Sequence, residues 1–315
     1  MPDDDWARRL ADEAEPYRTP PPADEWSDCI LSASLAGRTY KPPVQFVSGF
    51  LAPGLTVFAS PPKVGKTWTI HEMVLSVATG GNAFGVLATT PTEVLCLFFE
   101  DGERRVVARE RSLIGHDRGC GHITYVWADP DRPPWTMDRL ARYLDQHPHC
   151  RLVVIDTAQR FRAMQALVAS GQVYADDYAF FGELQRMAVS RGVCLVLLHH
   201  DRKPNGATGS LIDTVSGTRA IAGSADHLLY QSRDPETGIT TLRVEGRDLD
   251  PRRLDFIRSP EGQLRATAPA VTDLVTRLDQ QRRAREMRDA GQSFGAIAKA
   301  IGVGKATVVR WCSDN

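Results

Sequence analysis

Strand-length apolar runs alternate with helical patterns over residues 54–200, and this alternation constrains the fold more than any other feature. The runs are "GLTVFA", "EVLCLFFE", "ITYVWA", "RLVVID" and "VCLVLLHH", and the segments between them have helical spacing, beginning at Lys66. Runs that are apolar on both faces are typical of parallel strands covered by helices. With 315 residues, 42% of them hydrophobic, the chain can bury such a core. We therefore predict an α/β domain with a mostly parallel sheet.

The pattern changes after residue 226. Two alternating runs, "HLLYQSRD" and "TTLRVEGRD", flank the turn signal Asp-Pro-Glu-Thr-Gly, which predicts an antiparallel hairpin that extends the sheet. The next segment, "SPEGQLRATAPAVTD", dilutes the apolar pattern and is interpreted as a linker. The predicted domains are a partly ordered acidic arm over 1–45, the α/β domain over 46–268 and a small all-α domain over 269–315.

Composition restricts the class of protein. No apolar run approaches the roughly 18 residues that cross a bilayer, and the N-terminus is acidic, unlike a signal peptide. The six cysteines are scattered and form no C-x-x-C pair. We expect a cytoplasmic protein without a membrane partner.

The net charge of -1 hides an asymmetry between the two ends. Residues 1–30 hold nine acidic and three basic side chains, whereas residues 277–315 hold eight basic and four acidic ones. A basic end on a neutral chain favours a local polyanionic partner.

A candidate phosphate-binding loop, "SPPKVGKT", follows the first apolar run and precedes the first helix. In such loops backbone N–H groups surround a phosphate, the lysine neutralises phosphate oxygens and the threonine hydroxyl binds Mg²⁺. Glycine is replaced at the first position by Ser60. The predicted contacts to ATP come from Ser60, Pro61, Pro62, Lys63, Val64, Gly65, Lys66, Thr67 and Trp68. The alternative is an ordinary strand-to-helix turn that happens to contain Gly-Lys-Thr.

Polar side chains end three further apolar runs. Asp156 after "RLVVI" is a candidate second magnesium ligand, beside Thr67. Glu100 is a candidate base for the attacking water, although its neighbour Asp101 is an alternative cap of the following helix. His199 and His200 end the last run, where they would contact the nucleotide or lie on the surface as ordinary histidines.

These motifs, in this order, resemble the RecA-like P-loop ATPases of the plasmid RepA-type hexameric replicative helicase family, which phages and mobile elements carry. The resemblance covers about residues 45–260. It rests on "PPKVGKT", "FFEDGERR", "VVIDTAQRF", "YADDYAFFGELQRMA" with "VLLHHDRK", and "VSGTRAIAGSADHLLYQSRD" with "TLRVEGRD".

The resemblance implies specific roles. Lys66 and Thr67 would hold the phosphates and Mg²⁺, Asp156 would support the metal, Glu100 would be the catalytic carboxylate, and His200 would sense the γ-phosphate. Members of the family form rings in which a neighbouring subunit inserts an arginine into the site. Arg247 is the first candidate for that arginine and Arg219 the second, and the alternative for Arg247 is a solvated charge. Ser60 and the lack of a recognisable N-terminal collar domain leave ring formation and strand separation open.

The end of the chain carries a separate motif, "MRDAGQSFGAIAKAIGVGKATVVRW", which resembles resolvase-like helix-turn-helix domains. Ala298 would let two helices approach and Gly302 would form the turn between them. The recognition helix would run from about Lys305 to Trp311. Its predicted DNA contacts are Lys305, Thr307 and Arg310, while Val308 and Trp311 would pack inward. The alternative is a three-helix module that docks a protein.

These features together predict a DNA-dependent ATPase, an oligomeric replicative helicase or a close relative of one. A second hypothesis is a DNA-binding regulator or partition-type factor in which ATP controls assembly and no strand is unwound. A third is an ATPase scaffold whose terminal helices bind protein.

Overall fold

The computed structural model describes residues 29–30, 32–35, 38, 43–114, 119–129, 131–165, 173–200 and 223–313, with the backbone alone for 173–177 and 313. The chain divides into two compact units, Met1–Lys41 and Pro42–Asn315. In the first unit, the described residues include the 3-10 helix η2, Ser32–Leu35. The elements below belong to the second unit.

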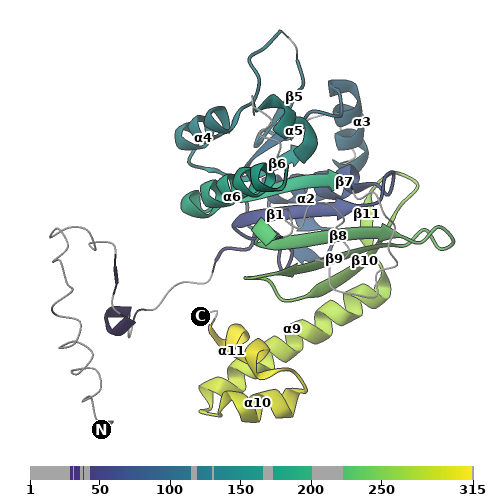
Figure 1. The fold of residues 1–315 in the computed structure, drawn as a ribbon. Coiled ribbons are helices and arrows are strands. Elements are labelled where there is room, and N and C mark those ends of the chain that lie inside the picture. Colours follow the sequence, from purple (N-terminus) through teal and green to yellow (C-terminus); the bar gives the residue numbers. More distant parts are fainter. Residues whose placement is uncertain are drawn as a thin grey trace, which may run out of the picture. The chain divides into compact units, whose positions relative to one another are not determined.

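A nine-stranded sheet forms the centre of the second unit, in the order β11-β10-β9-β8-β1-β7-β6-β4-β5 (Figure 1). Six neighbouring strands are parallel: β8 (His227–Arg233), β1 (Gly54–Ser60), β7 (Cys194–His200), β6 (Cys150–Asp156), β4 (Glu93–Phe98) and β5 (Ile123–Trp127). The other three are antiparallel: β9 (Thr240–Gly246), β10 (Arg252–Arg258) and β11 (Leu264–Ala266). A separate pair consists of β2 (Asn82–Ala83) and β3 (Leu87–Ala88).

Helices cover both faces of the sheet (Figure 1). One face packs against α2 (Lys66–Thr79) and α3 (Glu103–Ile114), and the other against α4 (Met137–Gln146), α5 (Ala158–Met164) and α6 (Val173–Arg191). Successive strand residues point to opposite faces, so Phe58 joins the first core and Val57 the second. The predicted α/β fold with a mostly parallel sheet and an antiparallel hairpin is confirmed.

The predicted linker is wrong. The segment "SPEGQLRATAPAVTD" contains β11 and the first turns of α9 (Ala268–Asp289), and the preceding segment forms β10. These two strands bury single alternate side chains, such as Leu254, Phe256 and Leu264. Because their other face is polar, the apolar pattern is too dilute to separate them from a loop.

Three helices form the end of the chain: α9, α10 (Phe294–Ile301) and α11 (Lys305–Ser313), drawn in yellow-green to yellow in Figure 1. Ser293 caps α10 by accepting a hydrogen bond from the Ala296 N–H. Gly302 ends α10 with φ 78°, a left-handed conformation that favours glycine. Val308 and Trp311 are buried in the shared core, so their predicted inward packing is confirmed.

Among the helices of the described residues, none has both the length and the apolar composition needed to cross a membrane.

A buried polar chain joins α2, β5 and α3. His71 lies fully buried with its Nε2 2.7 Å from the Tyr125 hydroxyl, and that hydroxyl donates to Glu110 Oε2 at 2.7 Å. Since the hydroxyl gives its only proton to Glu110, it accepts from the His71 Nε2–H. Burial, reinforced by the charge of Arg109, lowers the pKa of His71 to about 3. His71 is therefore neutral in the folded protein near neutral pH.

This lowered pKa makes the stability of the fold depend on pH. Below its ordinary pKa of 6.5, His71 binds a proton in the unfolded chain and not in the folded one. The free energy of unfolding should therefore fall as the pH drops from 6.5 towards 3, with a contribution of up to ~1.4 kcal/mol per pH unit. Urea unfolding at a series of pH values should show a shallower slope for His71→Gln than for the wild type. The exposed His122→Gln is the control, and equal slopes in all three proteins would contradict the assignment.

Candidate functional site

The residues predicted for the phosphates, the metal and the catalytic carboxylate meet at one edge of the sheet. Neighbouring parallel strands β1, β7, β6 and β4 end there, with Ser60 beside His200 and Phe98 beside Asp156 in the strand register. The loops that follow these four strands therefore start from a common edge, which is where α/β sheets bind ligands.

The loop after β1 does not need glycine at its first position. Ser60 is the last residue of β1, it is almost fully buried, and its hydroxyl donates to the Pro61 carbonyl at 3.0 Å. The left-handed backbone of this loop occurs at Lys63 (φ 65°) and Gly65 (φ 98°). The departure at Ser60 is therefore compatible with a phosphate-binding turn.

Backbone donors of this loop are concentrated in its second half. Pro61 and Pro62 have no N–H group, so a phosphate would be bound by the N–H groups from Lys63 to Thr67 at the start of α2. Gln231 on β8 supports the loop, because its Nε2 donates to the Val64 carbonyl at 3.1 Å.

Two contacts join the start of α2 to the neighbouring strand ends. The Lys66 ammonium donates to the His199 carbonyl at 2.5 Å, and the Thr67 hydroxyl donates to Asp156 Oδ2 at 2.9 Å. The His199 side chain itself is buried. Burial raises the pKa of the Asp156 carboxyl, while the hydrogen bond from Thr67 and the charge of Lys66 oppose that shift.

The oxygens of Thr67 and Asp156 fit Mg²⁺, which prefers hard oxygen ligands. Among the described residues, no group of three or more His, Cys, Asp or Glu side chains could hold a metal. Mg²⁺ at this position would therefore take its remaining ligands from nucleotide phosphates and water, as is usual for this ion.

Glu100 lies just beyond β4, between two polar side chains. Its Oε1 accepts from the Thr157 hydroxyl at 3.0 Å, and its Oε2 is 3.1 Å from His200 Nε2. The carboxylate remains partly exposed, with 35% of the side chain accessible. Three strand ends thus hold one carboxylate. The sequence reasoning missed Thr157, although its position directly after Asp156 was a signal.

The alternative role of Asp101 as a helix cap is not observed, because the Gly102 carbonyl accepts the first α3 hydrogen bonds. Asp101 forms ion pairs with Arg105 and with the buried Arg109. The Arg109 guanidinium also lies 5.6 Å from the centre of the Trp68 ring. One arginine of α3 therefore contacts both the neighbour of Glu100 and the neighbour of Thr67.

A cavity of about 370 Å³ adjoins the phosphate loop, and Trp68 lies in its wall. Its longer polar side chains are those of Lys63, Gln231, Arg233 and Arg258. The two arginines were missed from the sequence, because only the pairing of β8 with β1 brings Arg233 next to the loop.

The sequence profile of the AAA domain family matches residues 20–206, more than half of the chain. The chain belongs to the AAA domain family. A search of the curated proteins found no match.

Two solved structures are similar to this AAA domain protein. The first, which is an ATPase domain, has a TM-score of 0.54 at 12% identity, over 85% of this chain and 99% of that chain. A KaiC-like protein, PH0186 from Pyrococcus horikoshii OT3, has a TM-score of 0.46 at 14% identity, over 73% of this chain and 99% of that chain. The likeness to the first structure confirms the predicted RecA-like P-loop ATPase fold.

Arg247, the first candidate arginine finger, is not near the phosphate loop of the AAA domain. Arg247 follows β9 at the opposite edge of the sheet, where it pairs with Asp226 at 3.2 Å and keeps 64% of its side chain exposed. Any contact with a nucleotide would therefore need a second subunit. Arg219 lies outside the described residues.

The predicted DNA contacts on α11 differ in exposure. Lys305 is exposed, Thr307 is half-buried, and Arg310 forms an ion pair with Asp250 in the turn between β9 and β10. Arg310 is therefore partly occupied by an acidic partner that the sequence did not reveal.

The pair of Asp101 and Arg109 should position Glu100 for turnover. We expect Asp101→Asn to lower kcat for ATP hydrolysis at least tenfold, because small displacements of a reacting group cost up to about 10²-fold. The affinity for ATP should change less than about twofold, since Asp101 does not line the phosphate loop. Steady-state kinetics and nucleotide-binding titrations separate the two effects.

Arg105→Gln is the matched control for this pair. Arg105 contacts the same carboxylate at 3.4 Å but is 70% exposed, so its loss should have little effect. Equal losses of kcat in Arg105→Gln and Asp101→Asn would argue against a positioning role for the buried pair.

Proposed function

We propose that this AAA domain protein is a Mg²⁺-dependent ATPase that acts on DNA, of the RepA-type replicative helicase kind found on mobile elements and phages. The observation that carries the proposal is the 2.9 Å contact of Thr67 with Asp156, with Lys66 and Glu100 at the same sheet edge. No ordinary strand-to-helix turn requires a carboxylate, a lysine and a second carboxylate to converge in this way.

Each side chain has a chemical task in ATP hydrolysis. The N–H groups from Lys63 to Thr67 and the Lys66 ammonium would bind the phosphates, and Thr67 with Asp156 would hold the metal. Bound Mg²⁺ would supply charge neutralisation on the phosphate oxygens. Glu100 would accept the proton of the attacking water, because it is a partly exposed carboxylate fixed by Thr157 and His200.

The proposal includes a ring of subunits, six in the resembled family. Arg247 is exposed at the edge of the sheet that lies away from the phosphate loop, which is the placement required of a side chain that acts on a neighbour. Arg219 stays the second candidate.

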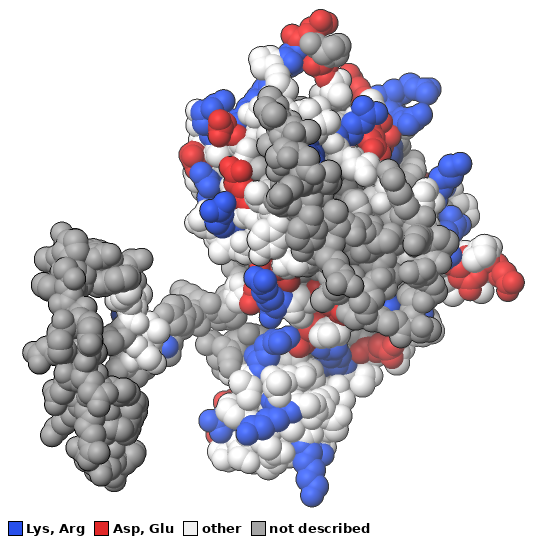
Figure 2. Space-filling model, viewed as in Figure 1, with Lys and Arg blue, Asp and Glu red and all other residues white. Residues whose placement is uncertain are grey.

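We further propose that the C-terminal helices bind DNA through a helix-turn-helix. Figure 2 shows Lys and Arg side chains gathered on the part of the molecule formed by these helices, and residues 277–315 carry eight basic and four acidic side chains. The turn at Gly302 and the inward packing of Val308 and Trp311 support this motif. Lys305 is the exposed candidate contact, and Thr307 is the half-buried one. Arg310 would contact DNA once its ion pair with Asp250 is broken.

A regulator or partition-type factor without unwinding activity is the second candidate. The ion pair of Arg310 with Asp250 favours it, because this contact joins the last helix to the sheet of the ATPase and would let the state of one affect the other.

Two substitutions test the nucleotide site. Lys66→Ala should weaken ATP binding about 10- to 100-fold, the loss expected for charge-assisted contacts. Glu100→Gln should keep ATP binding and lower turnover about 10²- to 10⁴-fold, the usual contribution of a general base. Normal hydrolysis by Glu100→Gln would remove Glu100 from this role.

A forked duplex separates the candidate functions, in a preparation whose assembly mass has been measured. Unwinding by the wild type and not by Lys66→Ala would identify a helicase, and binding by an oligomer without unwinding would favour the regulator. Lys305→Ala should weaken DNA binding on all sequences and lower the salt slope by about one. Absence of DNA binding at physiological salt would instead favour a module that docks protein.

A further inference from the structure

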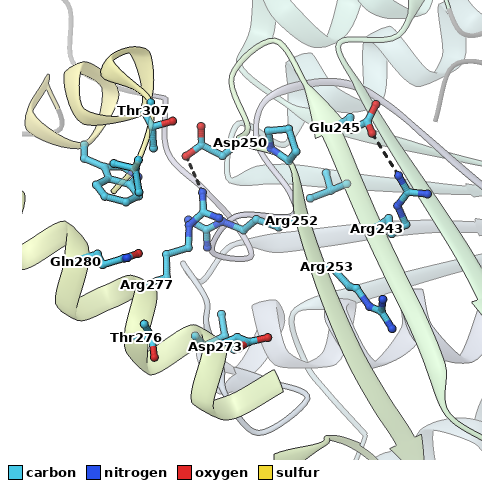
Figure 3. A pocket seen from close by; sticks show the side chains of 16 residues that line it. Arg243, Glu245, Asp250, Arg252, Arg253, Asp273, Thr276, Arg277, Gln280 and Thr307 are labelled. Carbon is cyan, nitrogen blue, oxygen red and sulfur yellow. Dashed lines mark hydrogen bonds and ion pairs between the residues drawn. The ribbon is translucent and has the colours of Figure 1, made fainter. Parts of the chain in front are cut away.

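We propose that Arg252, Arg277 and Trp311 form a binding site for a phosphate group, separate from the phosphate loop. The site lies in a cavity of about 710 Å³ between the turn after β9, helix α9 and the turn before α11 (Figure 3). Four arginines line this cavity: Arg243, Arg252, Arg253 and Arg277.

Positive charge exceeds negative charge around Asp250. Asp250 accepts from Arg277 at 3.0 Å and also pairs with Arg310. Figure 3 shows Arg252 beside Arg277 and Asp250, yet no hydrogen bond or ion pair among the described residues reaches the Arg252 guanidinium. Asp250 thus pairs with two of the three guanidinium groups around it, and the positive charge of Arg252 has no ion-pair partner among the described residues.

The other acidic side chains at the cavity act on other arginines. Glu245 pairs with Arg243 at 3.6 Å. Arg253 pairs with Asp255 at 2.9 Å and also interacts electrostatically with Asp273. None of these carboxylates balances Arg252.

Arg252 is unfavourably placed without an anion. Burial is the largest cause that lowers its pKa, to about 10, and the charge of Arg277 adds to it, while Asp250 alone opposes. Removing a guanidinium from water beside a second one is costly unless a negative group compensates.

Three buried N–H donors at the cavity have no hydrogen-bond partner among the described residues. They are Nε of Arg252, Nε of Arg277 and the indole Nε1 of Trp311, whose side chain is 2% exposed. Such donors are rarely left unpaired in proteins. Guanidinium groups match the oxygens of a phosphate in pairs, so this donor set favours phosphate over a single carboxylate.

The backbone makes room for the Arg252 guanidinium. It lies against Gly49, which has φ 75°, and a Cβ at that position would overlap Nη1 of Arg252. The turn at Gly49 therefore fixes the head of Arg252 in place, as expected of a built site and not of a mobile surface arginine.

The phosphate could belong to DNA bound at the turn before α11, since Gly304 and Thr307 also line the cavity, or to a small free anion. Both sources offer the same chemistry to the three donors. The cavity contains no residue of the phosphate loop, so the site stands whether or not ATP is hydrolysed.

Protein labelled with 5-fluorotryptophan tests the site by ¹⁹F NMR. The six tryptophan signals are assigned by single Trp→Phe variants, so that Trp311 reports this cavity and Trp68 reports the phosphate loop. Inorganic phosphate should shift the Trp311 signal. Separate titrations with a short single-stranded oligonucleotide and with a short duplex identify the source of the phosphate. The probe that shifts the Trp311 signal at the lowest concentration represents that source.

Two variants should change the apparent affinity in opposite directions. Arg252→Gln should weaken the phosphate response of Trp311 about tenfold, the loss of one charge-assisted contact. Asp250→Asn should strengthen it severalfold, because removing this carboxylate lowers the negative charge at the cavity and frees Arg277 for the anion. A variant that merely disturbed the fold would not tighten binding.

Arg282→Gln is the charge-matched control. Arg282 lies on α9 like Arg277 but is 67% exposed, pairs with Asp279 and does not line the cavity. It should leave the Trp311 response unchanged. A Trp311 signal that phosphate does not move, or one that responds equally in the wild type, Arg252→Gln and Asp250→Asn, would overturn the proposal.

Discussion

The hydrogen bond from Thr67 to Asp156 depends on the parallel arrangement of four strands, and the rest of the candidate site depends on it in turn. β7 lies between β1 and β6, so the residues that follow β1 and β6 can meet only across the end of β7. Lys66 makes the intermediate contact with the His199 carbonyl. A site assembled in this way is rigid, because each member is fixed by a buried strand.

Further contacts orient Glu100, the carboxylate proposed as the general base. Glu100 is partly exposed, and its carboxylate is held by Thr157, directly after β6, and by His200 at the end of β7. The ion pair of Arg109 with Asp101, the residue after Glu100, links α3 to the segment that carries Glu100. Buried ion pairs contribute little net stability, so the role predicted for this one is to position Glu100.

The last helices are joined to the sheet by charge. Asp250 accepts from Arg277 on α9 and from Arg310 on α11, which places the end of the chain beside the antiparallel strands. This junction explains why the predicted linker is ordered: α9 begins directly after β11 and runs on into the C-terminal core. A ligand that competes for these arginines would act on the same junction.

The sequence by itself determined the α/β class, the hairpin, the phosphate loop and the strand ends that carry Asp156 and Glu100, because apolar periodicity and local turn chemistry are properties of neighbouring residues. It failed at β10 and β11, which are half-polar and short. Only the tertiary structure decided that Thr157 and His200 meet at Glu100, that Arg233 lines the same cavity as the phosphate loop, and that Arg310 and Arg277 share Asp250. These contacts join residues far apart in the chain, and strand order and helix packing, which no local pattern encodes, bring them together.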